Sequence, residues 1–407
     1  MEPQAEASPL MPSQFAKHWN LDPKCLFLNH GSFGACPAPV LAAQQQLRQY
    51  MESQPVRFLA RELEGLWDAA RTDLALFVGG DADGLVFVPN ATTAINTVLG
   101  SLKLKRGDEL LVTDHEYNAC RNALISVAGK CEAKVVTAEL PFPAGSADDI
   151  LDAILSNVSQ RTKLLLVDHV TSQTAMVMPV ARLVWEMRKR GVETLVDGAH
   201  ALGMLPLDLQ ALGAAYYTGN CHKWLCAPKG SAFLFVRRDF RETVHPLVVS
   251  HGANSPRKDR SRFLLEFGWT GTYDPTPFLC VPEAIRFMAG LKPGGWPEVM
   301  RANRELALKE RRVLCGALAV RPPCPEALIG SMAAVPLPDS AGAEPAPPLF
   351  IDQLQDDLMA RHGIEVPVIN WPSHPKRILR ISAQLYNTEE QYAVLAAALG
   401  ERLKVEL

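Results

Sequence analysis

The stretch KLLLVDHVTSQTAMVMPVARLVWEMRKRGVETLVDGAH (residues 163–200) decides the fold. It opens and closes on short apolar runs, KLLLVDHV (163–170) and ETLVDGAH (193–200). Between them, VARLVWEMRKRG (180–191) repeats apolar residues at the spacing of a helix. Strand, helix and strand in this order predict two parallel strands joined by a helix.

The same alternation extends on both sides of this stretch. Further strand-like runs are GLVFVP (84–89), DELLVTD (108–114), AKVVTAEL (133–140) and SAFLFVRR (231–238), with helical segments at 94–102, 120–129 and 147–158. Near-continuous apolar strands that alternate with helices indicate an α/β fold, in which a mostly parallel sheet is covered on both faces. Ligands of such sheets bind beyond the carboxyl ends of the strands, so candidate site residues should follow these runs.

The rest of the chain predicts a second, smaller domain. We expect an N-terminal tail over 1–20, a large domain over 21–274 and a smaller α+β domain over 275–407. The helical pattern between residues 40 and 79 belongs to the large domain and is free to pack on the small one. A Pro-rich segment, 337–348, predicts a loop, and whether this loop gates the site stays open.

Composition narrows the class of protein. The 407 residues are 48% hydrophobic with a net charge of −3, so we expect a sizeable core and no nucleic-acid partner. No apolar run reaches the ~18 residues of a membrane span, and the nine cysteines form no CxxC pair, which favours a cytoplasmic protein without a bound metal. The last residues, KVEL (404–407), are similar to an ER-retention tail, but we expect them to end a helix.

A lysine and an aspartate at strand ends are the first candidate catalytic residues. Lys223 lies in YYTGNCHKWLCAPKG (216–230), which we expect to be buried. Burial lowers the pKa of a lysine and lets it form imines, although a lysine at a strand end can also simply extend into water. Asp197 ends an apolar strand, and a buried carboxylate needs a partner. A pyridinium nitrogen, a metal ion or a helix N-terminus would each serve.

Two further strand ends carry hydroxyls and a ring. Thr92 and Thr93 in NATTAIN (90–96) lie where a helix begins, so they either cap it or help its free N–H groups to bind a phosphate. Tyr117 in HEYNACR (115–121), or alternatively His115, can stack on a planar cofactor or belong to the core. A lysine, a carboxylate, hydroxyls at a helix start and a ring form the set that pyridoxal 5′-phosphate (PLP) needs.

These motifs resemble class V of the fold-type I PLP-dependent aminotransferase superfamily. The resemblance covers about residues 25 to 400 and rests on DGAH (197–200), the pair at 222–223, NHGSFG (29–34) and Arg380 in LRISAQLYNTEEQ (379–391). The pattern is similar to the isopenicillin N epimerase-like branch, which includes carbon–sulfur lyases such as cysteine desulfhydrases. The resemblance implies the type I fold, with a large domain built on a mostly parallel, mixed seven-stranded sheet, a smaller α+β C-terminal domain, and PLP as cofactor.

The resemblance also implies residue roles. Lys223 would hold PLP as a Schiff base and move protons, Asp197 would pair with the pyridine nitrogen, and His200 would lie near the phenolic oxygen of the ring. Gapless counting from Gly107 places Tyr117 at the stacking position. The positions that resemble the phosphate site are Thr92, Thr93, Asn220 and His222, with Thr272 supplied by the second subunit of a homodimer with shared active sites.

The substrate side is implied by Arg380, which matches the arginine that holds the α-carboxylate of an amino acid. Asn29, His30 and Arg57 are candidates for further substrate contacts, with surface or helix-capping roles as the alternative. Desulfurases with a similar ending carry a nucleophilic cysteine shortly before the arginine, but this sequence has no cysteine between Cys324 and Arg380. That difference disfavours a persulfide mechanism.

We therefore expect an enzyme that removes the Cα proton of an amino acid and eliminates a Cβ sulfur group from a cysteine-like substrate. Elimination needs one base, whereas epimerisation needs a second acid or base across the ring. Epimerisation, transamination, a catalytically silent PLP-binding protein and a purely structural protein remain alternatives. The sequence leaves the substrate side chain open.

Overall fold

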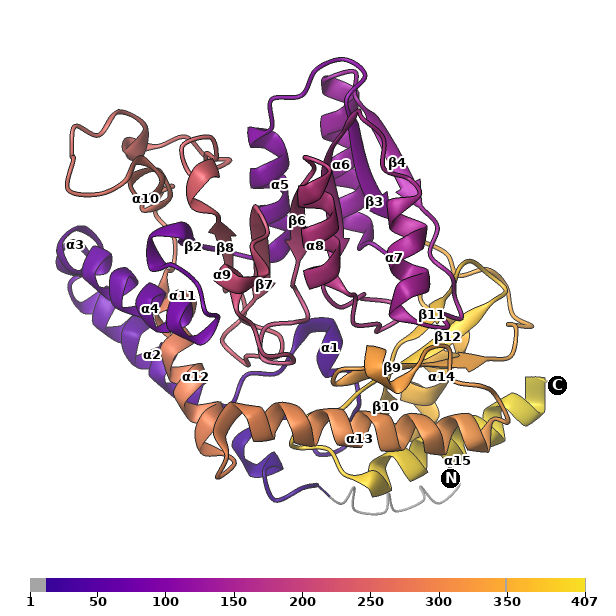
Figure 1. Ribbon diagram of the computed structural model, residues 1–407. Helices are drawn as coiled ribbons and strands as arrows, with labels where there is room; N and C mark the ends of the chain where they lie inside the picture. The colour runs from indigo at the N-terminus through magenta and orange to yellow at the C-terminus, as the bar shows by residue number, and fades with distance from the viewer. Residues whose placement is uncertain (1–11, 348–349, 407) are drawn as a thin grey trace.

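The computed structural model describes residues 12–347 and 350–406, so part of the expected tail, two residues of the Pro-rich segment and Leu407 lie outside it. Its centre is a seven-stranded sheet in the order β2-β8-β7-β6-β5-β3-β4 (Figure 1). These strands span Leu85–Val88 (β2), Glu109–Thr113 (β3), Lys134–Ala138 (β4), Thr162–Asp168 (β5), Glu193–Asp197 (β6), Tyr216–Asn220 (β7) and Ala232–Val236 (β8). Six of the strands run in one direction, and β8, which lies between β2 and β7, runs in the opposite direction. The predicted mostly parallel, mixed sheet is confirmed.

Six of the seven strands coincide with the apolar runs quoted from the sequence, although β5 begins one residue earlier, at Thr162. The seventh, β7, lies in YYTGN, which carries no aliphatic run although all five residues are buried. Its two tyrosines and Thr218 pack between β6 and β8, and the Thr218 hydroxyl donates to the Phe233 carbonyl at 2.8 Å. Tertiary packing therefore forms a strand that local apolar patterning does not predict.

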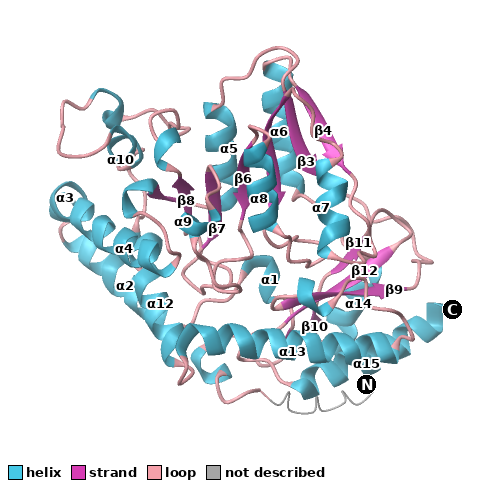
Figure 2. Cartoon of the chain, viewed as in Figure 1, coloured by secondary structure: helices cyan, strands magenta, loops and turns pink. Residues whose placement is uncertain are grey.

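Helices cover both faces of the sheet (Figure 2). Leu110 and Val112 of β3 pack into one cluster with residues of α5 (Ala91–Ser101) and α6 (Asn118–Lys130). Leu111, between them, packs into the other cluster with residues of α7 (Ala147–Leu155) and α8 (Val180–Lys189). Because successive strand residues point to opposite faces, one continuous apolar run serves two cores.

The C-terminal part is built on a three-stranded antiparallel sheet in the order β11-β12-β9. Its elements are β9 (Met332–Leu337), β11 (Val368–Asn370), β12 (Arg377–Ser382), α13 (Gly295–Ala317), α14 (Gln353–His362) and α15 (Glu389–Glu406). The described residues of the Pro-rich segment form no helix or strand after Leu337, as expected. The KVEL sequence begins within α15, also as expected, although Leu407 is not described.

The N-terminal segment joins the two parts. Strand β1 (Leu26–Phe27) pairs in parallel with β10 (Ile364–Glu365) of the C-terminal part. The remaining helices are α1 (His30–Phe33), α2 (Ala38–Ser53), α3 (Pro55–Arg57), α4 (Leu63–Phe77), α9 (Leu209–Leu212), α10 (Arg262–Phe267), α11 (Thr276–Leu279) and α12 (Val281–Gly290), with a π-helical turn at Phe58–Glu62. Since β1 pairs with β10, the division at residues 20 and 274 stays a prediction.

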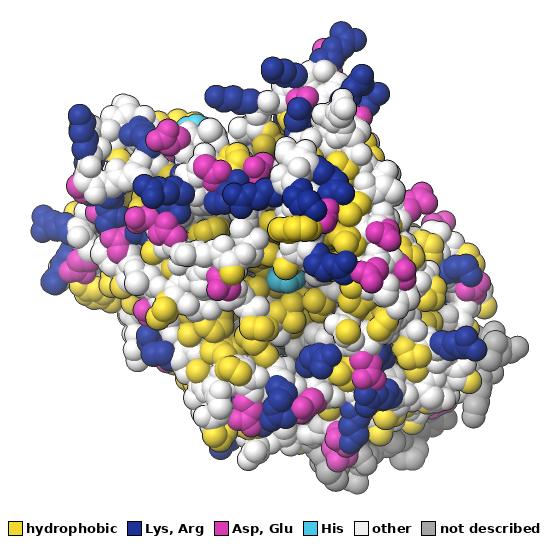
Figure 3. All heavy atoms as spheres, in the orientation of Figure 1, with side chains coloured by type: hydrophobic (Ala, Val, Ile, Leu, Met, Phe, Trp, Pro, Cys, Tyr) yellow, Lys and Arg dark blue, Asp and Glu magenta, His cyan; other side chains and the backbone are white. Residues whose placement is uncertain are grey.

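The surface carries both signs of charge. On the face in Figure 3, Lys and Arg lie among Asp and Glu around a hydrophobic centre above α13. Among the described residues, no helix is both long and apolar enough to cross a membrane.

Candidate active site

The carboxyl ends of β5, β6 and β7 meet the start of α5 at one edge of the sheet (Figure 1). The three strands end on Asp168, Asp197 and Asn220, and Lys223 lies in the turn after β7. The Asn220 side chain accepts a hydrogen bond from the Ala91 N–H at 2.9 Å. This contact ties the end of β7 to the first turn of α5, so Asn220 supports the predicted phosphate site by holding the helix in place.

Lys223 lies beside His200, with its Nζ 3.0 Å from Nε2 of the ring. Burial, followed by the positive charge of Arg380, lowers the pKa of Lys223 to about 8. Burial and the charge of Lys223 also hold the pKa of His200 well below its usual range, so this ring is neutral near pH 7. The pair combines an amine that loses its proton near neutral pH with an uncharged imidazole, as a Schiff-base lysine requires.

The backbone of Lys223 is held from the side of α1. Gly34 has a φ of +70°, and a Cβ there would lie 2.2 Å from the His222 carbonyl oxygen and 2.9 Å from Lys223 Cα, so a side chain does not fit. His30 is fully buried, with Nε2 3.1 Å from the Lys223 carbonyl oxygen and Nδ1 2.8 Å from the Tyr386 hydroxyl. The structure therefore places His30 behind the backbone of Lys223, where both ring nitrogens have protein contacts and the side chain is not exposed to a substrate.

Asp197 is a buried carboxylate without a cationic partner. One oxygen accepts a hydrogen bond from the Ala199 N–H at 2.9 Å, and the other accepts from the Cys120 thiol at 3.5 Å. Burial raises the pKa of Asp197, which Ala199 and Lys223 partly counteract. No Lys or Arg in the described chain forms an ion pair with Asp197. A ligand cation at this carboxylate would therefore offset the free-energy cost of keeping it ionised while buried.

Two further carboxyl groups lie near Asp197 and were not identified from the sequence. Glu116 and Asp168 are 1% and 3% exposed, and burial raises the pKa of each well above its usual range. Both follow strand runs that the sequence had singled out, Glu116 after β3 and Asp168 at the end of β5. The sequence does contain a signal for these two residues, because an acidic residue lies at or just after the end of each of three neighbouring strands, β3, β5 and β6.

The start of α5 presents the predicted phosphate-binding residues. Asn90 caps the helix and accepts hydrogen bonds from the Thr93 N–H at 2.8 Å and from its hydroxyl at 3.0 Å. Thr92 and Thr93 are half-buried in the first turn, where backbone N–H groups lack helical partners. His222 uses Nδ1 to contact the Ser231 carbonyl oxygen at 2.9 Å. The N-terminus of α5 is thus positioned for an anion, while the role of each residue stays a prediction.

Tyr117 and His115 differ in exposure. Tyr117 precedes α6 and is 46% exposed. His115 is buried, with Nδ1 2.8 Å from the Thr174 hydroxyl and its ring centroid 4.5 Å from that of Trp371. Burial lowers the pKa of His115 to about 4. The arrangement favours Tyr117 over His115 as the ring free to stack on a cofactor.

Arg380 lies on β12 as a buried cation without a carboxylate partner in the described chain. It donates to the Ser172 carbonyl at 2.5 Å, to Asn29 Oδ1 at 3.2 Å and to the Ser32 hydroxyl at 2.7 Å. Its Nε has no partner among the described residues, and burial lowers its pKa to about 10. This site fits a carboxylate ligand, and Asn29 contributes to it by orienting the guanidinium.

Two predicted residues are not brought to the site within one chain. Arg57 is exposed and forms an ion pair with Glu62 at 2.6 Å, on α3 at the far left of Figure 1. Thr272 is exposed and makes no hydrogen bond to the site residues of the described chain. Arg57 therefore makes a surface contact in this chain, and Thr272 stays a prediction for a second subunit.

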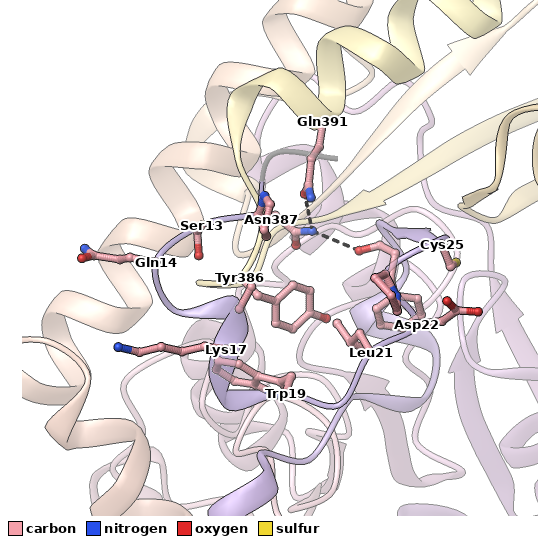
Figure 4. Close-up of a pocket in the computed structure, with 14 residues that line it drawn as sticks. Ser13, Gln14, Lys17, Trp19, Leu21, Asp22, Cys25, Tyr386, Asn387 and Gln391 are labelled. Atoms are coloured by element: carbon pink, nitrogen blue, oxygen red, sulfur yellow. Dashed lines mark hydrogen bonds between the residues drawn. The ribbon is translucent and has the colours of Figure 1, made fainter. Parts of the chain in front are cut away.

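A cavity of about 520 Å³ lies elsewhere, between the N-terminal segment and the turn before α15 (Figure 4). Asn387 lines this cavity, and its side chain donates hydrogen bonds to the Phe27 carbonyl and to Gln391 Oε1, both at 3.0 Å. None of the residues that line it is a predicted site residue, although its lining residue Tyr386 contacts His30.

The residues at the strand ends fit PLP. Lys223 supplies an amine with a pKa of about 8, and Asp197 supplies a buried carboxylate that a pyridinium nitrogen would neutralise. The N-terminus of α5 suits the phosphate, and the unpartnered Nε of Arg380 suits the carboxylate of an amino acid.

Comparisons with known proteins agree with this geometry. The family model described as aminotransferase class-V matches residues 28–263. The chain is 39% identical to isopenicillin N epimerase of Amycolatopsis lactamdurans, over 95% of this chain and 97% of the relative. It is 30% identical to a probable chloroplastic L-cysteine desulfhydrase of Arabidopsis thaliana, over 95% and 84%. A cysteine desulfurase structure from Thermococcus onnurineus NA1 shares the fold, with a TM-score of 0.79 at 19% identity over 98% of this chain and all of that one. The chain therefore belongs to the class V aminotransferase family of PLP-dependent enzymes.

Proposed function

We propose that the protein is a carbon–sulfur lyase that acts on a cysteine-like amino acid. The observation that carries this proposal is the single amine–imidazole pair of Lys223 and His200, at 3.0 Å. His115, the alternative to Tyr117 at the stacking position, is buried against Thr174 and Trp371. One base suffices for elimination. The similarity to cysteine desulfhydrases gives further support.

Each candidate site residue has a separate role in the proposed elimination. PLP, when bound, supplies a ring that accepts the electron pair left at Cα. Arg380 holds the substrate carboxylate and so fixes the direction of the Cα–H bond. Lys223 takes the Cα proton onto Nζ, and the neutral ring of His200 keeps a second positive charge away from it. Asp197 holds the positive charge of the pyridine nitrogen.

The overall reaction breaks the Cα–H, Cβ–S and Cα–N bonds and consumes one water, whose oxygen becomes the keto oxygen of the product. The substrate carbons leave as pyruvate, the amino group leaves as ammonium, and the sulfur leaves as a thiol or as sulfide. The sulfur is not transferred to a protein cysteine in this reaction, which agrees with the absence of a cysteine between Cys324 and Arg380 in the sequence.

An epimerase is the second candidate. The 39% and 36% identity to two isopenicillin N epimerases favours it. Epimerisation requires an acid or base on the face opposite Lys223, and the half-exposed Tyr117 is the residue with a suitable side chain.

We also propose a homodimer in the cytoplasm. Thr272 is exposed, has no role at its own chain's site, and follows Gly271, which has a φ of +123°. Its position resembles that of the residue that completes the phosphate site of a neighbouring subunit. All nine cysteines are free, which supports a reducing compartment.

A spectrum and a product assay test the proposal. The purified protein should show the absorbance band of PLP bound to a lysine, near ~420 nm. Lys223→Ala should abolish this band, whereas the exposed control Lys103→Ala should keep it. Incubation with L-cysteine and S-substituted cysteines should release pyruvate. Interconversion of enantiomers without pyruvate would favour the epimerase, and a band that persists in Lys223→Ala would contradict both candidates.

A further inference from the structure

Three buried carboxyl groups lie together behind the predicted cofactor site. Asp168 and Asp197 end the parallel strands β5 and β6 and are register partners, so their side chains leave the same face of the sheet. Glu116 follows β3, the neighbour of β5 on its other side. The three residues are 1–3% exposed. We refer to Glu116, Asp168 and Asp197 as the carboxyl cluster.

Within the part of the chain that the structure describes, the carboxyl cluster lacks counter-ions, and two of its members, Glu116 and Asp168, also lack side-chain donors for some of their oxygens. None of its members forms an ion pair with Lys or Arg in the described chain, although Lys223 acts on Asp168 and Asp197 at longer range. No donor side chain among the described residues satisfies either oxygen of Glu116 or Oδ2 of Asp168. An oxygen of Glu116, an oxygen of Asp197 and the Cys120 sulfur lie within 4.8 Å of one another.

The other titratable neighbours supply no positive charge. Burial lowers the pKa of His169 to about 4 and raises that of Tyr217, whose hydroxyl lies 2.8 Å from His169 Nδ1, so both are neutral near pH 7. Burial also raises the pKa of Cys120, which keeps the thiol protonated. One pyridinium can balance only one of three carboxylates, and leaving the others ionised and buried is costly. Protons must therefore neutralise part of the carboxyl cluster.

We propose that Glu116 and Asp168 share one proton beside Asp197, with Glu116 as its holder, and that the pair positions Asp197 as the ionised partner of the cofactor nitrogen. The cofactor part of this inference rests on the proposed function. The side chains of Glu116 and Asp168 lie within hydrogen-bonding reach of each other. Ionised carboxylates only accept hydrogen bonds, so this contact becomes a hydrogen bond only when one of the two carries a proton. Burial, followed by the charges of Asp168 and Asp197, favours the protonated form by raising the pKa of Glu116 well above its usual range.

This arrangement assigns different roles to the two members. The Glu116 proton relieves repulsion within the carboxyl cluster, so a neutral amide at this position should serve equally well. The remaining negative charge on Asp168 adds to that of Asp197 and stabilises a proton on the cofactor nitrogen. Glu116 and Asp168 are positioning residues, since neither needs to touch the cofactor.

Nitrogen NMR of the holoenzyme separates the two roles. PLP labelled with ¹⁵N in the ring reports directly whether the nitrogen is protonated. In Glu116→Gln, the pH at which this nitrogen loses its proton should match that of the wild type. In Asp168→Asn, it should fall by about one pH unit, a tenfold change in the protonation constant. Equal shifts in both variants, or no shift in either, would overturn the inference.

Cofactor-free protein gives a second readout that does not depend on the proposed function. A carboxyl group whose pKa is raised on folding destabilises the folded state as pH rises above its unfolded value, near 4.5 for glutamate. From pH 5.5 to 8, the melting temperature of the wild type should therefore fall more steeply than that of Glu116→Gln. The exposed control Glu139→Gln should match the wild type.

The outcomes are distinguishable. If the wild type shows no PLP band, the proposed function fails, and the melting temperatures alone then decide whether Glu116 holds a proton. Parallel slopes in wild type and Glu116→Gln would refute proton sharing even with PLP bound. A stoichiometric divalent metal that is lost in Glu116→Gln would make the carboxyl cluster a metal site and would also overturn the inference.

Discussion

Replacing Arg380 should remove the ability to tell an amino acid from its amide. Arg380 is a buried cation that the protein orients through Asn29, Ser32 and the Ser172 carbonyl without neutralising it. Those three contacts use three of the five N–H donors of a guanidinium, which leaves two for a ligand. We therefore expect the substrate carboxylate to complete this site.

The magnitude follows from the two remaining donors. A hydrogen bond to a charged group contributes about 1.5–3 kcal/mol, so two contribute about 3–6 kcal/mol. At 1.4 kcal/mol for each factor of ten, Arg380→Ala should lower kcat/KM by about 10²–10⁴-fold. Arg380→Lys keeps the charge but loses the planar fork, so its loss should be smaller, about 10–100-fold.

The assay compares L-cysteine, or the S-substituted cysteine that reacts best, with the corresponding amide. The wild type should prefer the acid by a factor similar to the loss in Arg380→Ala, because the amide lacks the charge that Arg380 binds. Arg380→Ala should treat the two substrates alike. If it keeps the preference for the acid, or if both substrates lose the same activity, Arg380 does not bind the carboxylate.

Three further predictions concern the lysine, the glycine beside it and the stacking ring. Because the pKa of Lys223 falls from 10.5 to about 8 on folding, the unfolded chain binds more protons there between these values, so the unfolding free energy of cofactor-free protein should rise with pH across this window relative to Lys223→Met. Chemical denaturation at pH 8, 9 and 10 measures this, and parallel curves would contradict it. Gly34→Ala should destabilise the protein by about 2–4 kcal/mol, from backbone strain plus the clash with the Lys223 turn. The control Gly107→Ala has a φ of +84° and open space around it, so it should lose only the ~1–2 kcal/mol of strain; equal losses in thermal unfolding would remove the clash argument. Tyr117→Phe should keep pyruvate formation within about threefold, since stacking needs only the ring; a loss of more than ~100-fold, matching the role of a proton donor, would favour the epimerase.

The sheet was predictable because its strands are buried on both faces. Runs such as KLLLVDHV carry enough aliphatic side chains for two cores, and this property is visible in the sequence itself. The strand at Tyr216–Asn220 was not, since its stability comes from neighbours on both sides rather than from its own composition. Sequence patterns thus identify strands that are locally apolar and omit those that tertiary packing forms.

The candidate site was predictable where a residue directly follows a strand. Asp197 lies at the sheet edge for this reason, at the end of β6. Lys223 follows β7, which local patterning did not predict, and was identified instead because its segment was expected to be buried. His30 was expected on the substrate side, but its position depends on how α1 folds against the Lys223 turn, which no local pattern encodes. Arg57 differs, since its partner is local: at the end of α3 it forms an ion pair with Glu62, five residues on. Tyr117 and Thr272 remain predictions.

The segment formed by β12 and the turn after it contacts the Lys223 backbone through His30 and also carries Arg380, the predicted substrate-carboxylate residue. Arg380 and Tyr386 lie in one segment, β12 and the turn that follows it. Arg380 faces the predicted carboxylate, while the Tyr386 hydroxyl contacts His30, whose other ring nitrogen contacts the Lys223 carbonyl. The path from the end of β12 to the lysine backbone therefore consists of two hydrogen bonds through one buried imidazole. Burial lowers the pKa of this imidazole to about 3, so it stays neutral and the path does not change with pH in the working range. A pH-independent link of this kind fixes the Lys223 backbone relative to β12, and so relative to Arg380. If Arg380 binds the substrate carboxylate and Lys223 takes the Cα proton, as proposed, this is the positioning that removal of a single Cα proton requires.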